Sequence, residues 1–403
     1  MRNQWTDCVL GDLVKIYSGV SPSNVFIVAG GGLPFVKVED LNSCQKYQTE
    51  ARERVEGDVP IVPTGSVLFP KRGAAISANK VRIAAVSIIM DTNMMALKPK
   101  VDRLDSEFLF YFIAFKQLSR IADVSSVPQI NNKHITPYPI SLPPLREQRR
   151  IAEILCTWDD AIEQLEALRA AKERRYNALA RMFFDPCHPT FHGRPNAWQE
   201  FELGDVFRER NQSGEEDDRL LSITMNGGVI DREDVGRKDT STEDKSNYKL
   251  ILPGDIGYNT MRMWQGVSGL SALRGIISPA YTVVSPLPNR VLGRYAAHLF
   301  KSRRMVFDFE RYSQGLTSDT WNLKFPAFSK IRVFLPSLED QEKQANLLDA
   351  LIVESTVIKK QLEALTRQKR GLMQKLLTGE WRVPLSTDDV EKSVKRTAEE
   401  LTP

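Results

Sequence analysis

Leu142-Pro143-Pro144-Leu145-Arg146-Glu147-Gln148 returns later in the chain as Leu335-Pro336-Ser337-Leu338-Glu339-Asp340-Gln341, at an offset of 193 residues. A second motif, Trp5-x4-Leu10-Gly11-Asp12-Leu13, returns at the same offset as Trp198-x4-Leu203-Gly204-Asp205-Val206. Two motifs of this length at one offset indicate an internal duplication. Each copy takes about half of the 403 residues, so two domains are expected.

The composition is that of an ordinary globular chain. Apolar residues make up 42% of the sequence and charged residues 26%, and no apolar run approaches the roughly 20 residues that would span a bilayer. The first residues, Met1-Arg2-Asn3-Gln4-Trp5, do not begin a signal peptide. We therefore expect a cytoplasmic protein without a membrane contact.

The cysteines and histidines do not predict a disulfide framework or a metal site. The four cysteines, Cys8, Cys44, Cys156 and Cys187, are far apart and form no C-x-x-C pair. Cys187-His188 with His192 is the one cluster that resembles metal ligands, and it lies among prolines in an expected connector. We interpret it as a set of scattered loop residues.

Basic residues are concentrated in two stretches that contain no acid. The net charge is only +4, but no Asp or Glu lies between Asp58 and Asp91 or between Asp255 and Asp308. The cations within them are Lys71, Arg72, Lys80 and Arg82 in the first stretch, and Arg262, Arg274, Arg290, Arg294, Lys301, Arg303 and Arg304 in the second. Such clustering sets the local electrostatic field. Because the two stretches occupy corresponding places in the two copies, we predict that the same face of each domain has the same function.

Two long helices are expected, one after each domain of short strands such as Ser66–Phe69 and Ala280–Val284. Apolar residues at three- and four-residue steps predict helices that pack on each other, and pseudo-symmetry would make them antiparallel. The expected interface residues are Ile151, Ile154, Trp158, Ile162, Leu165, Leu348, Leu351, Ile358, Leu362 and Leu365. The fold class is thus α+β, with two mixed α/β domains separated by an antiparallel coiled coil. The alternative is that each stripe belongs to the core helix of its own domain.

Local signals bound the second helix. Ser337 with Asp340 has capping-box spacing, and Gly379 is a plausible C-terminal stop. Gln164–Leu168 returns identically as Gln361–Leu365, but at an offset of 197. We therefore expect the second helix to carry four more residues than the first, about one helical turn, so that the two are not identical spacers.

The duplicated order of these motifs resembles that of type I restriction-modification specificity subunits. The shared pattern is W-x4-L-G-D, a variable domain, and then L-P-x-L-x-[ED]-Q at the start of a long helix; Ile277–Tyr281 and Leu376–Gly379 are also similar to recurring family segments. The resemblance covers residues 1 to about 383. It implies target-recognition domains at 1–145 and 198–336, spacer helices at 146–185 and 337–380, a connector at 186–197 and a polar tail at 381–403.

The resemblance also implies a function. Each target-recognition domain would read one half of a split double-stranded DNA sequence, while the helices would dock two methyltransferase subunits and restriction subunits would join. This chain would be non-catalytic and hold no cofactor, since S-adenosylmethionine, ATP and Mg²⁺ would belong to the partners. Modules about one turn of B-DNA apart, roughly 34–36 Å, predict an unread gap of about six or seven base pairs.

The candidate DNA contacts are residues of the types that read bases, Arg or Lys for guanine and Asn or Gln for adenine. In the first domain they are Lys71, Arg72, Asn79, Lys80 and Arg82, and, within the run Gln129–His134, Gln129, Asn131, Asn132 and Lys133. In the second domain they are Asn259, Arg262, Gln265, Arg274, Arg303 and Arg304. Each could instead be a solvated surface residue, so each cluster is the prediction and not its single members.

Little in the sequence predicts catalysis. The chain has no Gly-Lys dipeptide and hence no G-x-x-x-x-G-K-[ST] loop, and no G-x-G-x-x-G follows a strand. A Mg²⁺-dependent nuclease is the rival from another class, with Asp234 and Glu243-Asp244-Lys245 as carboxylate ligands, but these lie in a charge-rich loop. A coiled-coil adaptor without a DNA role is a third hypothesis, which leaves the two basic stretches unexplained.

Overall fold

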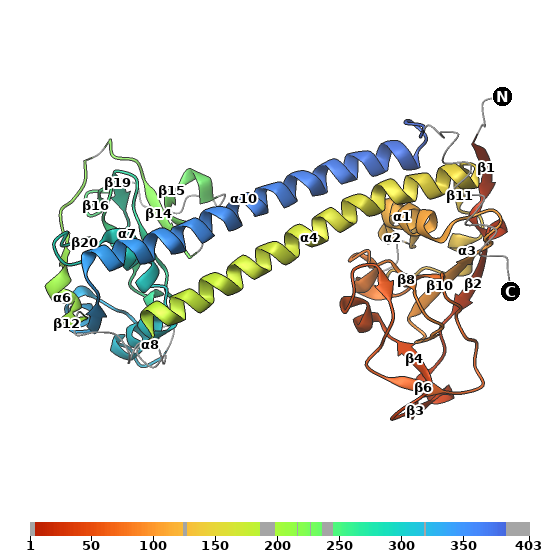
Figure 1. Ribbon diagram of the computed structural model, residues 1–403, viewed down its shortest axis with the longest axis horizontal. Helices are drawn as coiled ribbons and strands as arrows, with labels where there is room; N and C mark the ends of the chain where they lie inside the picture. The colour runs from red at the N-terminus through yellow and green to blue at the C-terminus, as the bar shows by residue number, and fades with distance from the viewer. Residues whose placement is uncertain are drawn as a thin grey trace. The chain divides into compact units, whose positions relative to one another are not determined.

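The computed structural model describes residues 5–123, 127–185, 198–215, 217–225, 227–235, 245–317 and 320–383. These residues form two compact units, the first within 1–165 and 361–403 and the second within 166–360. Each unit holds one mixed α/β domain and a part of each of two long helices (Figure 1). The predicted fold class is confirmed.

The domain of the first unit is built on a five-stranded sheet in the order β2-β10-β7-β8-β5, with a four-stranded sheet β3-β6-β4-β9 and the pair β1-β11 beside it. Its strands are β1 (Thr6–Val9), β2 (Val14–Ser18), β3 (Phe26–Val28), β4 (Leu33–Val36), β5 (Tyr47–Gln48), β6 (Arg54–Glu56), β7 (Val67–Pro70), β8 (Arg82–Ala84), β9 (Ile89–Met90), β10 (Met94–Pro99) and β11 (Pro139–Leu142). Its helices are α1 (Ser106–Lys116), α2 (Leu118–Ile121) and α3 (Asn132–Ile135), with short 3₁₀ helices η1 (Leu10–Asp12), η2 (Pro22–Asn24), η3 (Val38–Asn42) and η4 (Gly73–Ile76).

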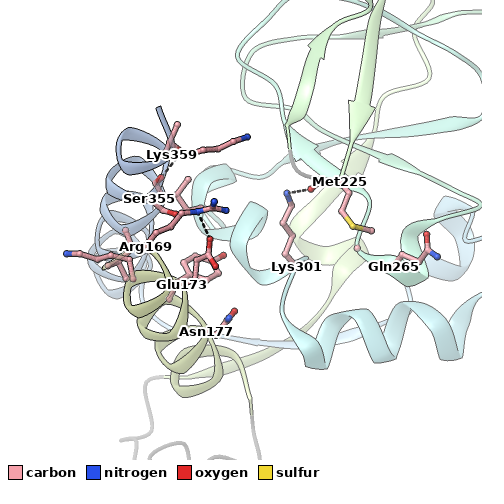
Figure 2. A pocket seen from close by; sticks show the side chains of 14 residues that line it. Arg169, Glu173, Asn177, Met225, Gln265, Lys301, Ser355 and Lys359 are labelled. Atoms are coloured by element: carbon pink, nitrogen blue, oxygen red, sulfur yellow. Dashed lines mark hydrogen bonds and ion pairs between the residues drawn. The ribbon is translucent and has the colours of Figure 1, made fainter. Parts of the chain in front are cut away.

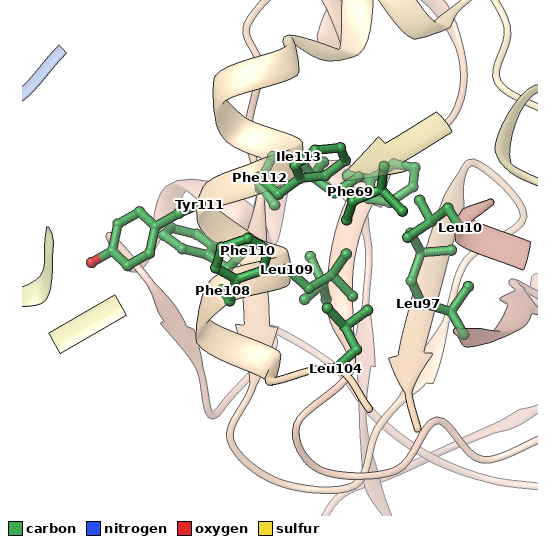
Figure 3. Close-up of a cluster of buried hydrophobic side chains, with 14 of the residues drawn as sticks. Leu10, Phe69, Leu97, Leu104, Phe108, Leu109, Phe110, Tyr111, Phe112 and Ile113 are labelled. Atoms are coloured by element: carbon green, nitrogen blue, oxygen red, sulfur yellow. The ribbon is translucent and has the colours of Figure 1, made fainter. Parts of the chain in front are cut away.

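Helix α1 forms the centre of this domain's core. Asp105 caps its first turn by accepting hydrogen bonds from the N–H groups of Glu107 and Phe108. All six residues from Phe108 to Ile113 are buried, which is typical of a helix covered on every side. Figure 3 shows this segment packed against side chains from the sheet and from η1, including Phe69 and Leu10.

The domain of the second unit repeats this topology. Its sheet order β13-β20-β17-β18 matches β2-β10-β7-β8, and the pair β12-β21 matches β1-β11. Its strands are β12 (Gln199–Glu202), β13 (Phe207–Glu209), β14 (Leu221–Thr224), β15 (Gly228–Asp231), β16 (Lys249–Ile251), β17 (Ile256–Asn259), β18 (Ser268–Leu270), β19 (Gly275–Ile277), β20 (Tyr281–Pro286) and β21 (Arg332–Leu335). Its helices are α6 (Leu203–Val206), α7 (Gly293–Leu299), α8 (Arg303–Tyr312) and α9 (Phe325–Phe328), with η5 (Glu233–Val235) and η6 (Met263–Gln265).

The glycine of each W-x4-L-G-D motif lies at a close approach of two backbone segments. Gly11 donates its N–H to the carbonyl oxygen of Thr136 at 3.1 Å, and Gly204 donates to that of Ser329 at 2.9 Å. A Cβ atom would lie 2.8 Å from the Thr136 oxygen and 3.2 Å from the Ser329 oxygen. Glycine is therefore required for packing at position 11, and Gly204 lies at the same close approach with slightly more room.

The glutamine that ends each L-P-x-L-x-[ED]-Q motif fixes the domain to its long helix. Gln148 is fully buried; its Oε1 accepts from the Asp105 N–H at 2.8 Å, and its Nε2 donates to the carbonyls of Arg103 and Pro143. The buried Gln341 makes the same three bonds, each 3.0 Å long: its Oε1 accepts from the Leu292 N–H, and its Nε2 donates to the carbonyls of Arg290 and Pro336. The motif thus joins the helix start to the loop before α1 or α7.

The two long helices, α4 (Leu145–Phe184) and α10 (Leu338–Leu377), are 40 residues each. The prediction that the second would be four residues longer is therefore wrong. The five residues Gln164–Leu168 of α4 recur as Gln361–Leu365 of α10, one helical turn further from the start of the helix. A four-residue shift returns nearly to the same helix face, so the repeated segment moves along the helix without a change in helix length. The predicted ends hold: the Ser337 hydroxyl bonds to the Asp340 N–H at 3.2 Å, and Gly379 has φ +75°.

Within each unit α4 and α10 run antiparallel. In the first unit Ile151 near the start of α4 shares a core cluster with Leu376 near the end of α10, and Asp159 pairs with Lys369. In the second unit Phe184 at the end of α4 shares a cluster with Leu348 near the start of α10. The ten residues predicted for the helix interface are all buried or half-buried.

Candidate nucleic-acid interface

Two of the predicted sets of DNA-contact residues in the first domain, one beside Lys71 and one in the run Gln129–His134, lie next to each other in the fold. The loop after β7 and the polar run before α3 pair as extended backbone, with an isolated bridge between Arg72 and Gln129. The N–H of Ile130 donates to the carbonyl of Lys71 at 2.9 Å, and the N–H of Gly73 donates to the carbonyl of Pro128 at 2.9 Å. Arg72 is exposed, and so are Asn131, the N-cap residue of α3, and Asn132 and Lys133, the first two residues of that helix.

The second domain repeats this arrangement. The N–H of Leu323 donates to the carbonyl of Thr260 at 2.9 Å, at the place that Ile130 and Lys71 occupy in the first domain. Arg72 is the N-cap residue of η4 after β7, and Arg262 is the N-cap residue of η6 after β17. Both arginines are exposed. We call the two loops, 71–73 and 260–266, the basic loops.

The basic loop of the second domain packs against α8. Met263 of η6 shares the core cluster with Met305 and Phe309 of α8. Gln265 is half-buried, whereas Arg303 at the start of α8 is exposed. The structure gives Arg262 and Arg303 no carboxylate partner among the described residues.

Three predicted contacts of the first domain are engaged in holding its loops. Asn79, with φ +49°, donates from Nδ2 to the carbonyl of Ala114 at 2.8 Å and accepts from the N–H of Leu118 at 2.9 Å. Arg82 donates to the carbonyls of Leu41 and Val81, and Lys80 donates to the side chain of Asn42. The side-chain amide of Asn79 and the two terminal guanidinium nitrogens of Arg82 are therefore committed to the fold.

Three predicted contacts of the second domain are likewise engaged. Arg274 pairs with Asp218 at 2.9 Å and with Glu215 at 3.2 Å, and Arg304 pairs with Asp308 at 2.7 Å. The Glu215 backbone N–H and the Arg274 guanidinium hold the pKa of Asp218 below its ordinary value. The side chain of Asn259 accepts a hydrogen bond from the Met261 N–H and so shapes the basic loop.

A basic pocket that the sequence analysis missed lies beside the second basic loop (Figure 2). It has a volume of about 710 Å³ and is lined by both long helices and by the second domain. Its cations are Arg169 and Lys172 of α4, Lys359 of α10 and Lys301 of the second domain. Of these four, the sequence analysis named only Lys301, as a member of the second acid-free stretch. The helical three lie outside the acid-free stretches, so charge counting along the chain could not find them.

The alternative sites are weak or lie outside the described residues. No group of three or more His, Cys, Asp or Glu in the described part of the chain could hold a metal ion. Asp234 is exposed in η5, while Glu243-Asp244 and Cys187-His188 with His192 lie outside the described residues. No helix in the described ranges is long and apolar enough to cross a membrane.

Comparison with known proteins gives consistent matches. Residues 2–172 match the family model described as the type I restriction modification DNA specificity domain. A type I restriction enzyme specificity subunit of Methanocaldococcus jannaschii, MjaVIII, is 25% identical over 94% of this chain and 93% of its own length. A putative type I specificity subunit of Mycoplasma pneumoniae is 21% identical over 78% of this chain and 88% of its own length.

Two solved structures share the fold. The S subunit of a type I restriction-modification system from M. genitalium has a TM-score of 0.58 at 16% identity, covering 96% of this chain and 98% of that chain. A structure described as showing complex assembly and conformational transition of the type I R-M system has a TM-score of 0.55, also at 16% identity, covering 93% and 97%.

The fold and its basic loops define a duplicated two-domain protein whose domains share a pair of long helices. The matched family model takes in the first domain and most of α4, and the relatives align along both halves. Along nearly its whole length the chain is similar to type I restriction-modification specificity subunits.

Proposed function

We propose that this protein reads a bipartite double-stranded DNA target, one half-site with each domain. The target-recognition domains would be 1–145 and 198–336, and the spacer helices 146–185 and 337–380. Arg72 with Gln129–Lys133 would contact the first half-site, and Arg262, Gln265 and Arg303 the second. Arg and Lys suit phosphates and guanine edges, while Asn and Gln suit adenine.

The observation that carries the proposal is the recurrence of an exposed arginine at the N-cap of the 3₁₀ helix that follows a central strand, two residues after β7 and three residues after β17. Arg72 and Arg262 each cap a short 3₁₀ helix after a central strand, and each loop is held by a backbone bond from the segment before α3 or α9. Core packing does not require an exposed cation at either position. A surface used twice for the same kind of ligand accounts for both.

The helices support a spacing and docking role. At about 1.5 Å per residue a helix of this length extends roughly 60 Å, more than the roughly 34–36 Å between modules one turn of B-DNA apart. We propose an unread gap of about six or seven base pairs. α10 also has exposed apolar side chains at Leu347, Val353 and Val357, which suit a protein partner. That partner would be the methyltransferase, in two copies, with restriction subunits joining it.

Catalysis would belong to the partners. In this reading the chain contributes recognition, and the methyltransferase supplies the S-adenosylmethionine and the N6-adenine transfer. The chain is expected to act in the cytoplasm, where the DNA is.

The test is the map of methylated bases in host DNA with the gene intact and with the gene deleted. We expect one split motif, with two dissimilar halves, to lose its N6-methyladenine on deletion. A continuous motif, or a gap nearer a dozen base pairs, would contradict the spacing. Arg262→Gln should weaken binding to that motif, whereas Arg274→Gln, which removes an arginine already paired with carboxylates, serves as the matched control.

A further inference from the structure

We propose that the basic pocket of the second unit holds backbone phosphates of the DNA next to the second half-site; this inference rests on the proposed function. The pocket is lined on one side by α4 and α10 and on the other by Met225, Gln265, Gly266 and Lys301 (Figure 2). All of its lining residues belong to the second unit.

The pocket carries an excess of positive charge. Four cations line it, and Glu173 is the one carboxylate among its lining residues. Glu173 is already paired with Arg169 at 3.0 Å, and Lys172 pairs with Glu354 at 2.6 Å. Lys359 is exposed and has no carboxylate partner among the described residues. Such a site favours an anion, with Lys359 the cation most available to bind it.

The wall on the domain side is held by a hydrogen bond of Lys301 and by a turn at Gly266. Lys301 is an exposed residue whose Nζ donates to the carbonyl of Met225 at 3.0 Å, and partial desolvation of the ammonium group lowers its pKa. Gly266 has φ +79°, and a Cβ there would lie 3.2 Å from the Val306 side chain. The loop therefore turns sharply at the pocket edge, directly after Gln265.

The choice of DNA over another anion follows from continuity with the proposed interface. Gln265 and Gly266 line the pocket and belong to the basic loop that begins at Arg262, and Lys301 precedes Arg303 of α8 by two positions. A duplex bound at Arg262 and Arg303 would bring a long line of phosphates past the same loop. Cations contact phosphates without reading sequence, so the pocket would add affinity rather than specificity.

The experiment uses the full chain assembled with its methyltransferase subunits. The probes are two labelled duplexes, one carrying the methylated motif and one with the second half-site scrambled. Dissociation constants are measured by anisotropy at 50 and 200 mM KCl for the wild type, for Lys359→Gln and for Lys360→Gln. Lys360 is the matched control, because it is the next exposed lysine of α10 and does not line the pocket.

The expected result is a smaller salt dependence for Lys359→Gln alone. Each phosphate contact contributes a slope of about 0.9, so the fold-loss of affinity over this fourfold range should shrink about 3.5-fold. The reduction in salt dependence should be equal on both duplexes, and the sequence of the methylated motif should stay the same. An unchanged salt dependence for Lys359→Gln would overturn the inference while leaving the proposed function intact.

A second readout separates DNA from a protein ligand. Assembly with the methyltransferase is measured without DNA by sedimentation. Weaker assembly of the Lys359→Gln variant at an unchanged salt dependence would identify the pocket as a dock for an acidic protein segment, and the DNA assignment would fall. A wild-type complex that does not distinguish the two duplexes would overturn the proposed function itself.

Discussion

Replacing Gln341 by leucine should release the second domain from α10. Leucine fills a similar volume but removes all three hydrogen bonds of a fully buried side chain, two from Nε2 and one to Oε1, each 3.0 Å. At about 1 kcal/mol per net hydrogen bond the loss is about 3 kcal/mol, and the buried groups left unpaired raise it toward about 5 kcal/mol. The first unit should be untouched, because its own contact uses Gln148.

Calorimetry and hydrogen exchange measure this loss separately in each unit. For a unit of this size about 3 kcal/mol lowers the transition midpoint by about 6–12 °C. The amide of Leu292, which donates to the Gln341 side chain, should lose protection, while amides of α1 should keep theirs. Lys360→Leu, an exposed position of α10 in the same unit, is the control and should shift the midpoint by less than about 2 °C. A shift that small for Gln341→Leu as well would refute the reasoning.

Three further outcomes follow from close packing and buried charge. Gly11→Ala should destabilise the first unit by about 1–3 kcal/mol in thermal unfolding, because its Cβ would lie 2.8 Å from a carbonyl oxygen, whereas Gly371→Ala, with open space in mid-helix, should stabilise by up to about 1 kcal/mol. Burial holds the pKa of His298 below its ordinary 6.5 despite hydrogen bonding to Asp349. The folded state therefore takes up a proton less readily than the unfolded state, so unfolding measured against pH should show full stability above about pH 6.5, lost as the pH falls below it, and a flatter profile for His298→Gln. Glu147→Gln should cost about 1–3 kcal/mol, because the buried carboxylate accepts two hydrogen bonds from Arg382 at 2.8 Å; an unchanged midpoint in thermal unfolding would contradict this.

The duplication could be predicted because its motifs carry backbone constraints. Gly11 and Gly204 meet a neighbouring carbonyl, and Gln148 and Gln341 each satisfy three backbone groups. Such residues tolerate little change in either copy, so they mark the repeat even where the strands between them have diverged. The long helices could be predicted from the spacing of their apolar residues, because packing restricts those positions in the same way.

The candidate site could be predicted only as a region. Pairing across the fold decides which cations remain available, and a stretch without acids in the sequence can still meet acids in space. Arg274 is 56 positions from Asp218, yet the two form an ion pair. The side-chain roles of Asn79 likewise depend on a backbone turn with φ +49° that no local motif signals. The sequence predicts a second helix that is four residues too long, because the repeated segment Gln361–Leu365 is shifted by one turn and such a shift is indistinguishable in the sequence from an insertion.

The two units differ in how the chain closes them. The second unit is one continuous segment, 166–360, whereas the first needs α4 residues such as Ile151 to meet Leu376 and Leu377 of α10. Glu147 and Arg382 are separated by 235 positions. On the ribosome the second unit can therefore fold as soon as its segment emerges, while the apolar start of α4 must wait for the end of α10. The unit translated first is thus completed last, and during that interval the apolar face at the start of α4 stays uncovered.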